Sequence, residues 1–194
     1  MKLNYQWPLP SQPRPIAIIG SGGIVKDAHL PAYQKAEFKV LGVYDINPEQ
    51  SAKIANSWNL KAFGSLDSLI SSAQSQNAVF DLALPPSAIS NVLEQLPEHA
   101  TVLIQKPMGS DLEEAKLIKA ICERKKLTAA VNFQLRFSPM MLALKDAMSK
   151  GHLERILDLE VHLNLEASWE LFPFLKKMER VEIAVHSIHY LDLI

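Results

Sequence analysis

Short apolar runs alternate with helical segments over the first two thirds of the sequence, and this alternation constrains the fold more than any other feature. The runs lie at 15–20, 38–45, 78–86, 101–104 and 128–137. Each is followed by a stretch with helical spacing or helix-forming composition. Continuous apolar runs are typical of strands that are buried on both faces of a parallel sheet. We therefore predict an α/β fold, a doubly wound parallel sheet with helices on both sides.

A different pattern begins after Gly151. From Leu157 to Trp169, apolar residues alternate strictly with polar ones. This period of two is typical of a strand with one face open to water, which belongs in an antiparallel or mixed sheet. One such strand cannot satisfy both of its edges. We therefore expect an incomplete α+β mixed-sheet domain after the parallel sheet, and a chain that is a truncated part of a longer protein.

The composition excludes several classes of protein. Twenty basic and twenty-one acidic residues give a formal net charge of −1, so we predict no nucleic-acid partner. No apolar run is long enough to span a membrane, and the irregular leader at 1–14 lacks the apolar core of a signal peptide. The single cysteine, Cys122, excludes an internal disulfide, and no C-x-x-C metal spacing is present. The H-x-x-H spacing of His186 and His189 could suggest a metal site, but a third ligand is missing, so we predict none. We expect a cytoplasmic protein.

A glycine-rich turn connects the first predicted strand to a helix, and it contains Gly20, Gly22 and Gly23. Glycines at this place allow a tight turn and let the backbone approach a pyrophosphate at the start of the helix. The sixth position of the G-x-G-x-x-G pattern is Val25, which we expect to loosen the packing of the helix against the strand. The alternative is a simple glycine turn without a ligand.

Asp45 follows the second predicted strand, where a carboxylate can accept both hydroxyls of an adenosine ribose. The same carboxylate would repel a 2′-phosphate, so we predict NAD as the cofactor rather than NADP. Asp45 could instead cap the helix that follows it.

Several motifs, in their order and spacing, resemble the glucose-fructose oxidoreductase and inositol dehydrogenase family, Gfo/Idh/MocA. They are "GSGGIVKDAHLPAY", "VYDINPE", "ALPPSAI", "QKPMGSDLEEA", "VNFQLRFSP" and "HSIHYLDLI". The resemblance implies a Rossmann domain at 15–136 and the start of a substrate and oligomerisation domain at 137–194. It also implies hydride transfer between a nicotinamide and a sugar or polyol, and a homo-oligomer. The implied cofactor-binding residues are Gly20, Ser21, Gly22, Gly23, Ile24, Asp45, Pro85, Pro86, Gln105 and Lys106.

The family's E-K-P motif corresponds to Gln105, Lys106 and Pro107. The resemblance implies that Lys106 is catalytic. It would hydrogen-bond the substrate hydroxyl and the nicotinamide ribose, and its charge would favour the alkoxide that develops as hydride leaves. Glutamine in place of glutamate removes a carboxylate that could orient the ammonium group. We also expect a cis bond before Pro107.

Five further positions are interpreted through the same resemblance. Pro85 and Pro86 match a double-proline loop near the nicotinamide, while Ile89 stands where histidine is common. Asn132 and Arg136 resemble residues that line the far side of the substrate pocket. Arg136 could equally be a surface ion-pair partner.

The proton-transfer motif of the family, D-x-G-x-H-x-x-D, fits this sequence in two registers. In the preferred one, His189 is the histidine and Val185 replaces the aspartate. Shifted by three residues, Glu182 takes the place of the aspartate and His186 that of the histidine. Either imidazole could act as a general acid or base near neutral pH. Departures from the family pattern keep a second function class open, a regulatory module that binds nucleotide or sugar without turnover; they are Val185, Gln105, Ile89 and Val25. A truncated chain could also be an inactive fragment of the enzyme.

Overall fold

The computed structural model describes residues 2–166, 175 and 179–194, and it divides into two compact units. The first unit is Ser11–Asn132, and the second combines Met1–Pro10 with Phe133–Ile194. The boundary at 132 lies four residues before the boundary that we expected at 136. Most of the leader groups with the second unit.

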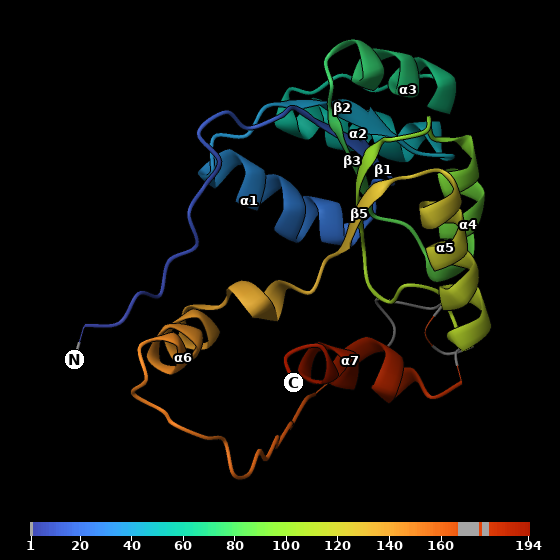
Figure 1. The fold of residues 1–194 in the computed structure, drawn as a ribbon. Helices are drawn as coiled ribbons and strands as arrows, with labels where there is room; N and C mark the ends of the chain where they lie inside the picture. The colour runs from blue at the N-terminus through green and yellow to red at the C-terminus, as the bar shows by residue number, and fades with distance from the viewer. Residues whose placement is uncertain (1, 167–174, 176–178) are drawn as a thin grey trace. The chain divides into compact units, whose positions relative to one another are not determined.

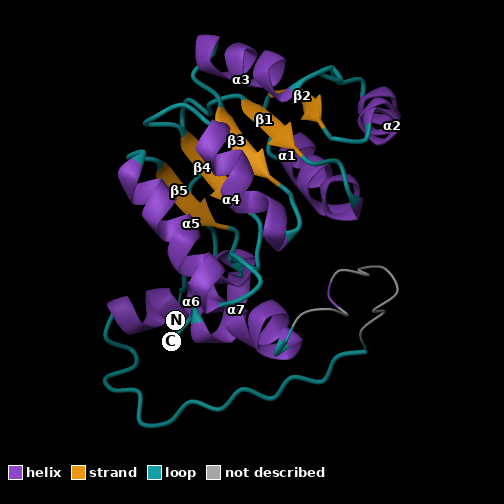
Figure 2. Cartoon of the chain, turned by 90° about the vertical axis from the view of Figure 1, so that its right-hand side faces the viewer, coloured by secondary structure: helices purple, strands orange, loops and turns teal. Residues whose placement is uncertain are grey.

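The Ser11–Asn132 unit is built around a sheet of five parallel strands in the order β2-β1-β3-β4-β5 (Figure 2). The prediction of a doubly wound parallel sheet is therefore confirmed. An isolated parallel bridge between Val43 and Ala62 adds a sixth position beside β2. The strands are β1 (Ile16–Ile19), β2 (Val40–Tyr44), β3 (Val79–Leu82), β4 (Thr101–Ile104) and β5 (Thr128–Val131).

Helices pack on both faces of this sheet (Figure 1), because alternate residues of each strand point to opposite sides. Ile16 and Ile18 share an apolar cluster with residues of the helices η1, α1 and α2, whereas Ala17 and Ile19 share one with α3, α4 and α5. The helices are η1 (Val25–His29), α1 (Leu30–Lys35), α2 (Pro48–Trp58), α3 (Leu66–Ser75), α4 (Pro86–Gln95) and α5 (Leu112–Arg124).

The register of the strands aligns their carboxyl ends. Ile19 pairs with Tyr44 on one side and with Leu82 on the other, and the pairing continues from Leu82 to Ile104 and from Ile104 to Val131. The residues that come next in the chain therefore form a row along one edge of the sheet. This row is Asp45, Gly20, Ala83, Gln105 and Asn132.

The second unit contains η2 (Gln134–Phe137), α6 (Pro139–Ser149), η5 (Ile183–Ser187) and α7 (Ile188–Leu191). Its leader segment packs on this helical part, since the Trp7 ring meets the Phe137 ring edge-on at 5.2 Å and the Asn4 amide donates to Asp146 at 2.8 Å. Within the described residues, no helix is long and apolar enough to cross a bilayer.

The predicted strand from Leu157 to Trp169 differs from the structure. Residues 157–166 form neither strand nor helix, and 167–169 lie outside the described residues. A period of two shows which side chains would share a face, but a strand also needs a neighbouring backbone to bond. The described residues of this unit contain no such strand, so the alternation alone does not produce one.

Candidate functional site at the carboxyl edge of the sheet

The glycine turn begins directly at the end of β1. Gly20 has φ +97°, and a Cβ there would lie 2.3 Å from the carbonyl oxygen of Ala83. Only glycine fits this position, because the left-handed backbone and the close strand both exclude a side chain. Gly22 differs, since a Cβ built on it meets no atom within 4 Å. The turn thus has a rigid base and an open face, as backbone binding of a pyrophosphate requires.

Asp45 holds this turn through its carboxylate. Its Oδ2 accepts hydrogen bonds from the amide of Ser21 at 2.7 Å and from the Ser21 hydroxyl at 2.8 Å. Its Oδ1 accepts from the amide of Asn47 at 2.9 Å. The alternative role as cap of α2 belongs instead to Asn47, whose side chain accepts from the amides of Glu49 and Gln50.

The helix after the turn starts as a π-helical segment, η1, and continues as α1. Val25, at the sixth position of the glycine pattern, is fully buried among Ile16, Ile18 and Val43. The amide of Leu30 donates to the carbonyl of Val25 five residues back. The valine side chain fills part of the core, and the expected loosening of the helix against the strand stays a prediction.

Gln105 and Lys106 follow β4, the strand beside β3. The backbone N–H of Gln105 donates to the carbonyl of Leu82 at 2.9 Å. Gln105 is buried, and its side-chain Oε1 accepts a hydrogen bond from Asn132 Nδ2 at 3.0 Å. Lys106 is half-buried, and this burial lowers the pKa of its amine below the ordinary value for lysine. The peptide bond between Lys106 and Pro107 is cis, as predicted.

The double-proline loop lies after β3, where Pro85 precedes the first residue of α4, Pro86. Ile89 is fully buried in the core beneath α4. The position at which the family commonly has histidine therefore contributes to packing in this chain.

Three polar residues that contact one another inside this unit were not identified from the sequence. Asp81 in β3 is fully buried, and its Oδ2 lies 2.7 Å from His29 Nδ1 and 2.8 Å from the Tyr33 hydroxyl. Burial, together with the Asp81 carboxylate, raises the pKa of Tyr33 far above its ordinary range, so Tyr33 stays a hydrogen-bond donor. The signal was available in "AVFDLAL", because a carboxylate inside an apolar strand must be paired.

The remaining predicted site residues belong to the second unit and are described within it. His186 Nδ1 lies 2.8 Å from Glu182 one helical turn earlier, and the buried His189 meets the ring of Phe133 edge-on at 5.9 Å. Val185, which replaces the aspartate of the family motif, is buried.

Arg136 lies in η2 of the same unit and is exposed. Its guanidinium forms two hydrogen bonds of 2.5 Å to the carboxylate of Asp192. This contact corresponds to the ion-pair alternative that its sequence context left open, and the role of Arg136 in substrate binding stays a prediction.

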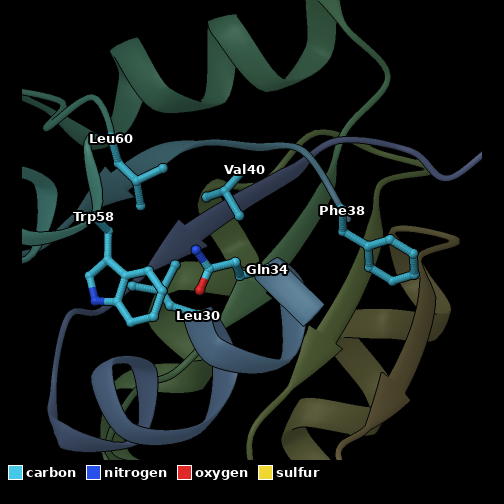
Figure 3. A pocket seen from close by; sticks show the side chains of 6 residues that line it. All are labelled: Leu30, Gln34, Phe38, Val40, Trp58 and Leu60. Carbon is cyan, nitrogen blue, oxygen red and sulfur yellow. The ribbon is translucent and has the colours of Figure 1, made fainter. Parts of the chain in front are cut away.

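A mostly apolar pocket is lined by residues of α1, α2 and β2 and of the loops beside them (Figure 3). It includes Val40, the first residue of β2, and therefore lies at the amino end of that strand. It contains none of the predicted site residues. Its lining residues are Leu30, Gln34, Phe38, Val40, Trp58 and Leu60.

In the described parts of the chain, no group of three histidine, cysteine, aspartate or glutamate side chains gathers in a way that could hold a metal ion.

Comparison with known proteins supplies relatives for this arrangement. The family model described as "Oxidoreductase family, NAD-binding Rossmann fold" matches residues 14–133. The chain is 31% identical over 150 residues to glucose-6-phosphate 3-dehydrogenase of Bacillus subtilis. The aligned region covers 76% of this chain and 41% of that protein. It is 27% identical over 132 residues to UDP-N-acetylglucosamine 3-dehydrogenase of Acidithiobacillus ferrooxidans, covering 64% and 40%. The chain thus spans about two fifths of the length of these relatives.

Solved structures show the same fold. The structure of the Acidithiobacillus ferrooxidans enzyme matches with a TM-score of 0.57 at 26% identity, over 69% of this chain and 42% of that one. An oxidoreductase from Agrobacterium radiobacter, in complex with NAD+, L-tartaric acid and magnesium, matches with a TM-score of 0.72 at 18% identity, over 94% and 54%. With a family model that covers residues 14–133, the chain belongs to the Gfo/Idh/MocA family of oxidoreductases with an NAD-binding Rossmann fold.

Proposed function

We propose that this chain is the nicotinamide-binding part of an NAD-dependent dehydrogenase that acts on a hydroxyl carbon of a sugar, polyol or related compound. One observation carries the proposal. The strand register brings the glycine turn, Asp45 and the Gln105–Lys106 pair to the same edge of the sheet. Ligands of doubly wound sheets bind at the carboxyl ends of the strands. Two relatives named as sugar 3-dehydrogenases support a phosphorylated or nucleotide-linked sugar as substrate.

The residues of the turn suit an NAD molecule. The open face at Gly22 leaves room for a pyrophosphate against the backbone amides at the start of the helix. Asp45 would accept the hydroxyls of the adenosine ribose, since each carboxylate oxygen can accept more than one hydrogen bond. Ile46 beside it is 91% exposed and offers no charge to pair with a 2′-phosphate. We therefore propose NAD rather than NADP.

Lys106 is proposed to handle the proton of the substrate hydroxyl. NAD, when bound, accepts the hydride from the carbon that carries this hydroxyl. Because burial lowers the pKa of Lys106, more of its amine is neutral near physiological pH than in a solvated lysine. The neutral amine can accept the hydroxyl proton, and the resulting ammonium stabilises negative charge on the oxygen.

Calorimetric titration with NAD and NADP tests the cofactor assignment. We expect NAD to bind more tightly than NADP. Asp45→Asn should lower the affinity for NAD and reduce the difference between the affinities for NAD and NADP. Asp67→Asn removes one exposed carboxylate in the first turn of α3 and is the matched control. Equal affinity of the unmodified chain for both nucleotides would exclude Asp45 from the ribose site.

Turnover is tested on the protein expressed from its complete reading frame. NAD reduction is followed by absorbance with sugar phosphates, nucleotide sugars and polyols in turn. NAD binding without turnover of any of these classes would favour the alternative, a binding module that regulates another process.

A further inference from the structure

A chain of hydrogen-bonded polar side chains runs from Asp81 in the interior of the sheet to Gln105, the residue before Lys106. Asp81 is fully buried and pairs with Ile18 of β1, whose apolar cluster includes residues of η1, α1 and α2. A buried carboxylate is costly unless it is hydrogen-bonded. Tyr33 and His29 both bond its Oδ2, at 2.8 and 2.7 Å. Among the described residues, Asp81, His29 and Tyr33 are the titratable side chains of this hydrogen-bonded group.

The directions of these bonds follow from the Asp81 carboxylate together with a neutral His29. Asp81 is an acceptor, so His29 carries its hydrogen on Nδ1, and in the neutral imidazole Nε2 is then an acceptor. Asn132 Nδ2 lies 3.4 Å from this Nε2 and 3.0 Å from Gln105 Oε1. The two hydrogens of one amide group thus satisfy both acceptors, and the Asn132 amide is oriented by His29.

The end of the chain of bonds coincides with the end of strand β4. The backbone N–H of Gln105 donates to the carbonyl of Leu82 in β3, and the backbone N–H of Asn132 donates to the carbonyl of Ile104 at 2.8 Å. The main chain at the end of β4 is therefore hydrogen-bonded to the strand on each side. Gln105 is 8% exposed, and Lys106 is the next residue. Whatever orients Gln105 therefore acts one peptide unit from Lys106.

We propose that His29 and Asn132 are positioning residues: the Asp81-bound tautomer of His29 orients the Asn132 amide, which holds Gln105 and so fixes Lys106 at the end of β4. This inference rests on the proposed function, in which Lys106 handles the hydroxyl proton. If the link is cut, β4 loses a side-chain anchor at its carboxyl end, and Lys106 gains freedom to reach water.

Two variants cut the link while leaving Asp81 hydrogen-bonded. In His29→Asn, the side-chain amide can replace Nδ1 as donor to Asp81, but nothing replaces Nε2. In Asn132→Leu, His29 and Tyr33 still bond Asp81, and only the link to Gln105 is removed. Tyr33→Phe is the matched control, because it removes a donor to Asp81 and leaves the link to Gln105 in place.

The measurement is the titration of the Lys106 amine, followed by NMR of the side-chain nitrogen in this chain. We expect its apparent pKa to rise toward that of a free lysine in His29→Asn and Asn132→Leu, and to stay unchanged in Tyr33→Phe, whose thermal midpoint falls. Unchanged titration in either folded link variant overturns the proposal. A shift in Tyr33→Phe as large as in the link variants also overturns it, since general loosening then explains the effect. If His29→Asn does not fold, Asn132→Leu decides alone.

A kinetic arm separates this inference from the proposed function. In the complete protein, both link variants should lower kcat by roughly 10- to 100-fold with unchanged NAD affinity, as expected for a displaced catalytic group. A shifted Lys106 titration in a protein without dehydrogenase activity would support the positioning role and reject the function. Full activity of both link variants would reject the positioning role.

Discussion

Gly22→Ala should stabilise the fold and weaken NAD binding in the same molecule. A Cβ at Gly22 meets no atom within 4 Å, and the residue has no left-handed φ. Alanine at such a position restricts the unfolded chain and raises the free energy of unfolding by about 0.4–1 kcal/mol. The packing of the chain itself therefore gives no steric reason for a glycine at position 22.

The reason appears only if a phosphate approaches the backbone there. A hydrogen bond from an amide to a charged group contributes about 1.5–3 kcal/mol. Losing one such bond weakens binding by roughly 10- to 150-fold, since about 1.4 kcal/mol corresponds to a factor of ten. We expect a loss of this size in Gly22→Ala, because the added methyl group keeps the pyrophosphate at a distance.

Two other glycines provide the controls. Gly64, in the loop before α3, also has no atom within 4 Å of an added Cβ, so Gly64→Ala should give the same gain in stability with normal NAD affinity. Gly20→Ala places a Cβ 2.3 Å from the Ala83 carbonyl oxygen at φ +97°. It should lower stability by at least about 1–2 kcal/mol from the left-handed backbone alone.

Urea unfolding and calorimetric titration with NAD measure both quantities on each variant. The expected pattern is a stabilised non-binder at Gly22, a stabilised binder at Gly64 and a destabilised protein at Gly20. Unchanged NAD affinity in Gly22→Ala, with the chain correctly folded, would refute the assignment of this turn to the pyrophosphate.

The other predictions concern the chemistry and are made for the complete protein. Lys106→Met should keep NAD affinity and reduce turnover by ~100-fold or more, measured by steady-state kinetics. Because the lowered pKa belongs to an amine that must be neutral to accept a proton, the oxidation rate should rise with pH through that pKa, and a pH profile of kcat/KM should lose this limb in Lys106→Met. Single replacements of His186 and His189 by asparagine should affect turnover unequally, and the larger loss identifies which of the two histidines also takes part in proton transfer. Equal, small losses would exclude both histidines from that role.

The parallel sheet was predictable because most of its strands are short, mainly apolar runs separated by helical segments. The run at Ile16–Ile19 is buried at all four positions, so a pattern without alternation was enough to place it inside the sheet. The position of Asp45 could be predicted from the parallel arrangement, because the carboxyl ends of parallel strands share one edge of the sheet. Residues 157–166 show the limit of such patterns, because alternation says nothing about whether a partner strand is present.

The polar interior could not be derived in the same way. His29 and Asp81 are 52 residues apart, and their contact depends on which face of β3 carries Asp81 and on the π-helical turn that carries His29. Local patterns determine neither. The sequence did indicate a problem to be solved, a carboxylate within an apolar strand, but not its partners.

The glutamine at position 105 affects the pKa that we expect for Lys106, but it does not remove the proposed role of Lys106 in proton transfer. A glutamate beside Lys106 would favour the ammonium form and oppose the effect of burial on its pKa. With Gln105, burial is the cause of the lowered pKa, and the side chain is still held, because its Oε1 accepts from Asn132. Gln105→Glu should therefore raise the pKa of Lys106 and move the rising limb of the pH profile to higher pH, measured by the same NMR titration and kinetics. A limb that stays in place would show that position 105 does not act on the lysine electrostatically, and that its contribution is confined to holding the end of β4.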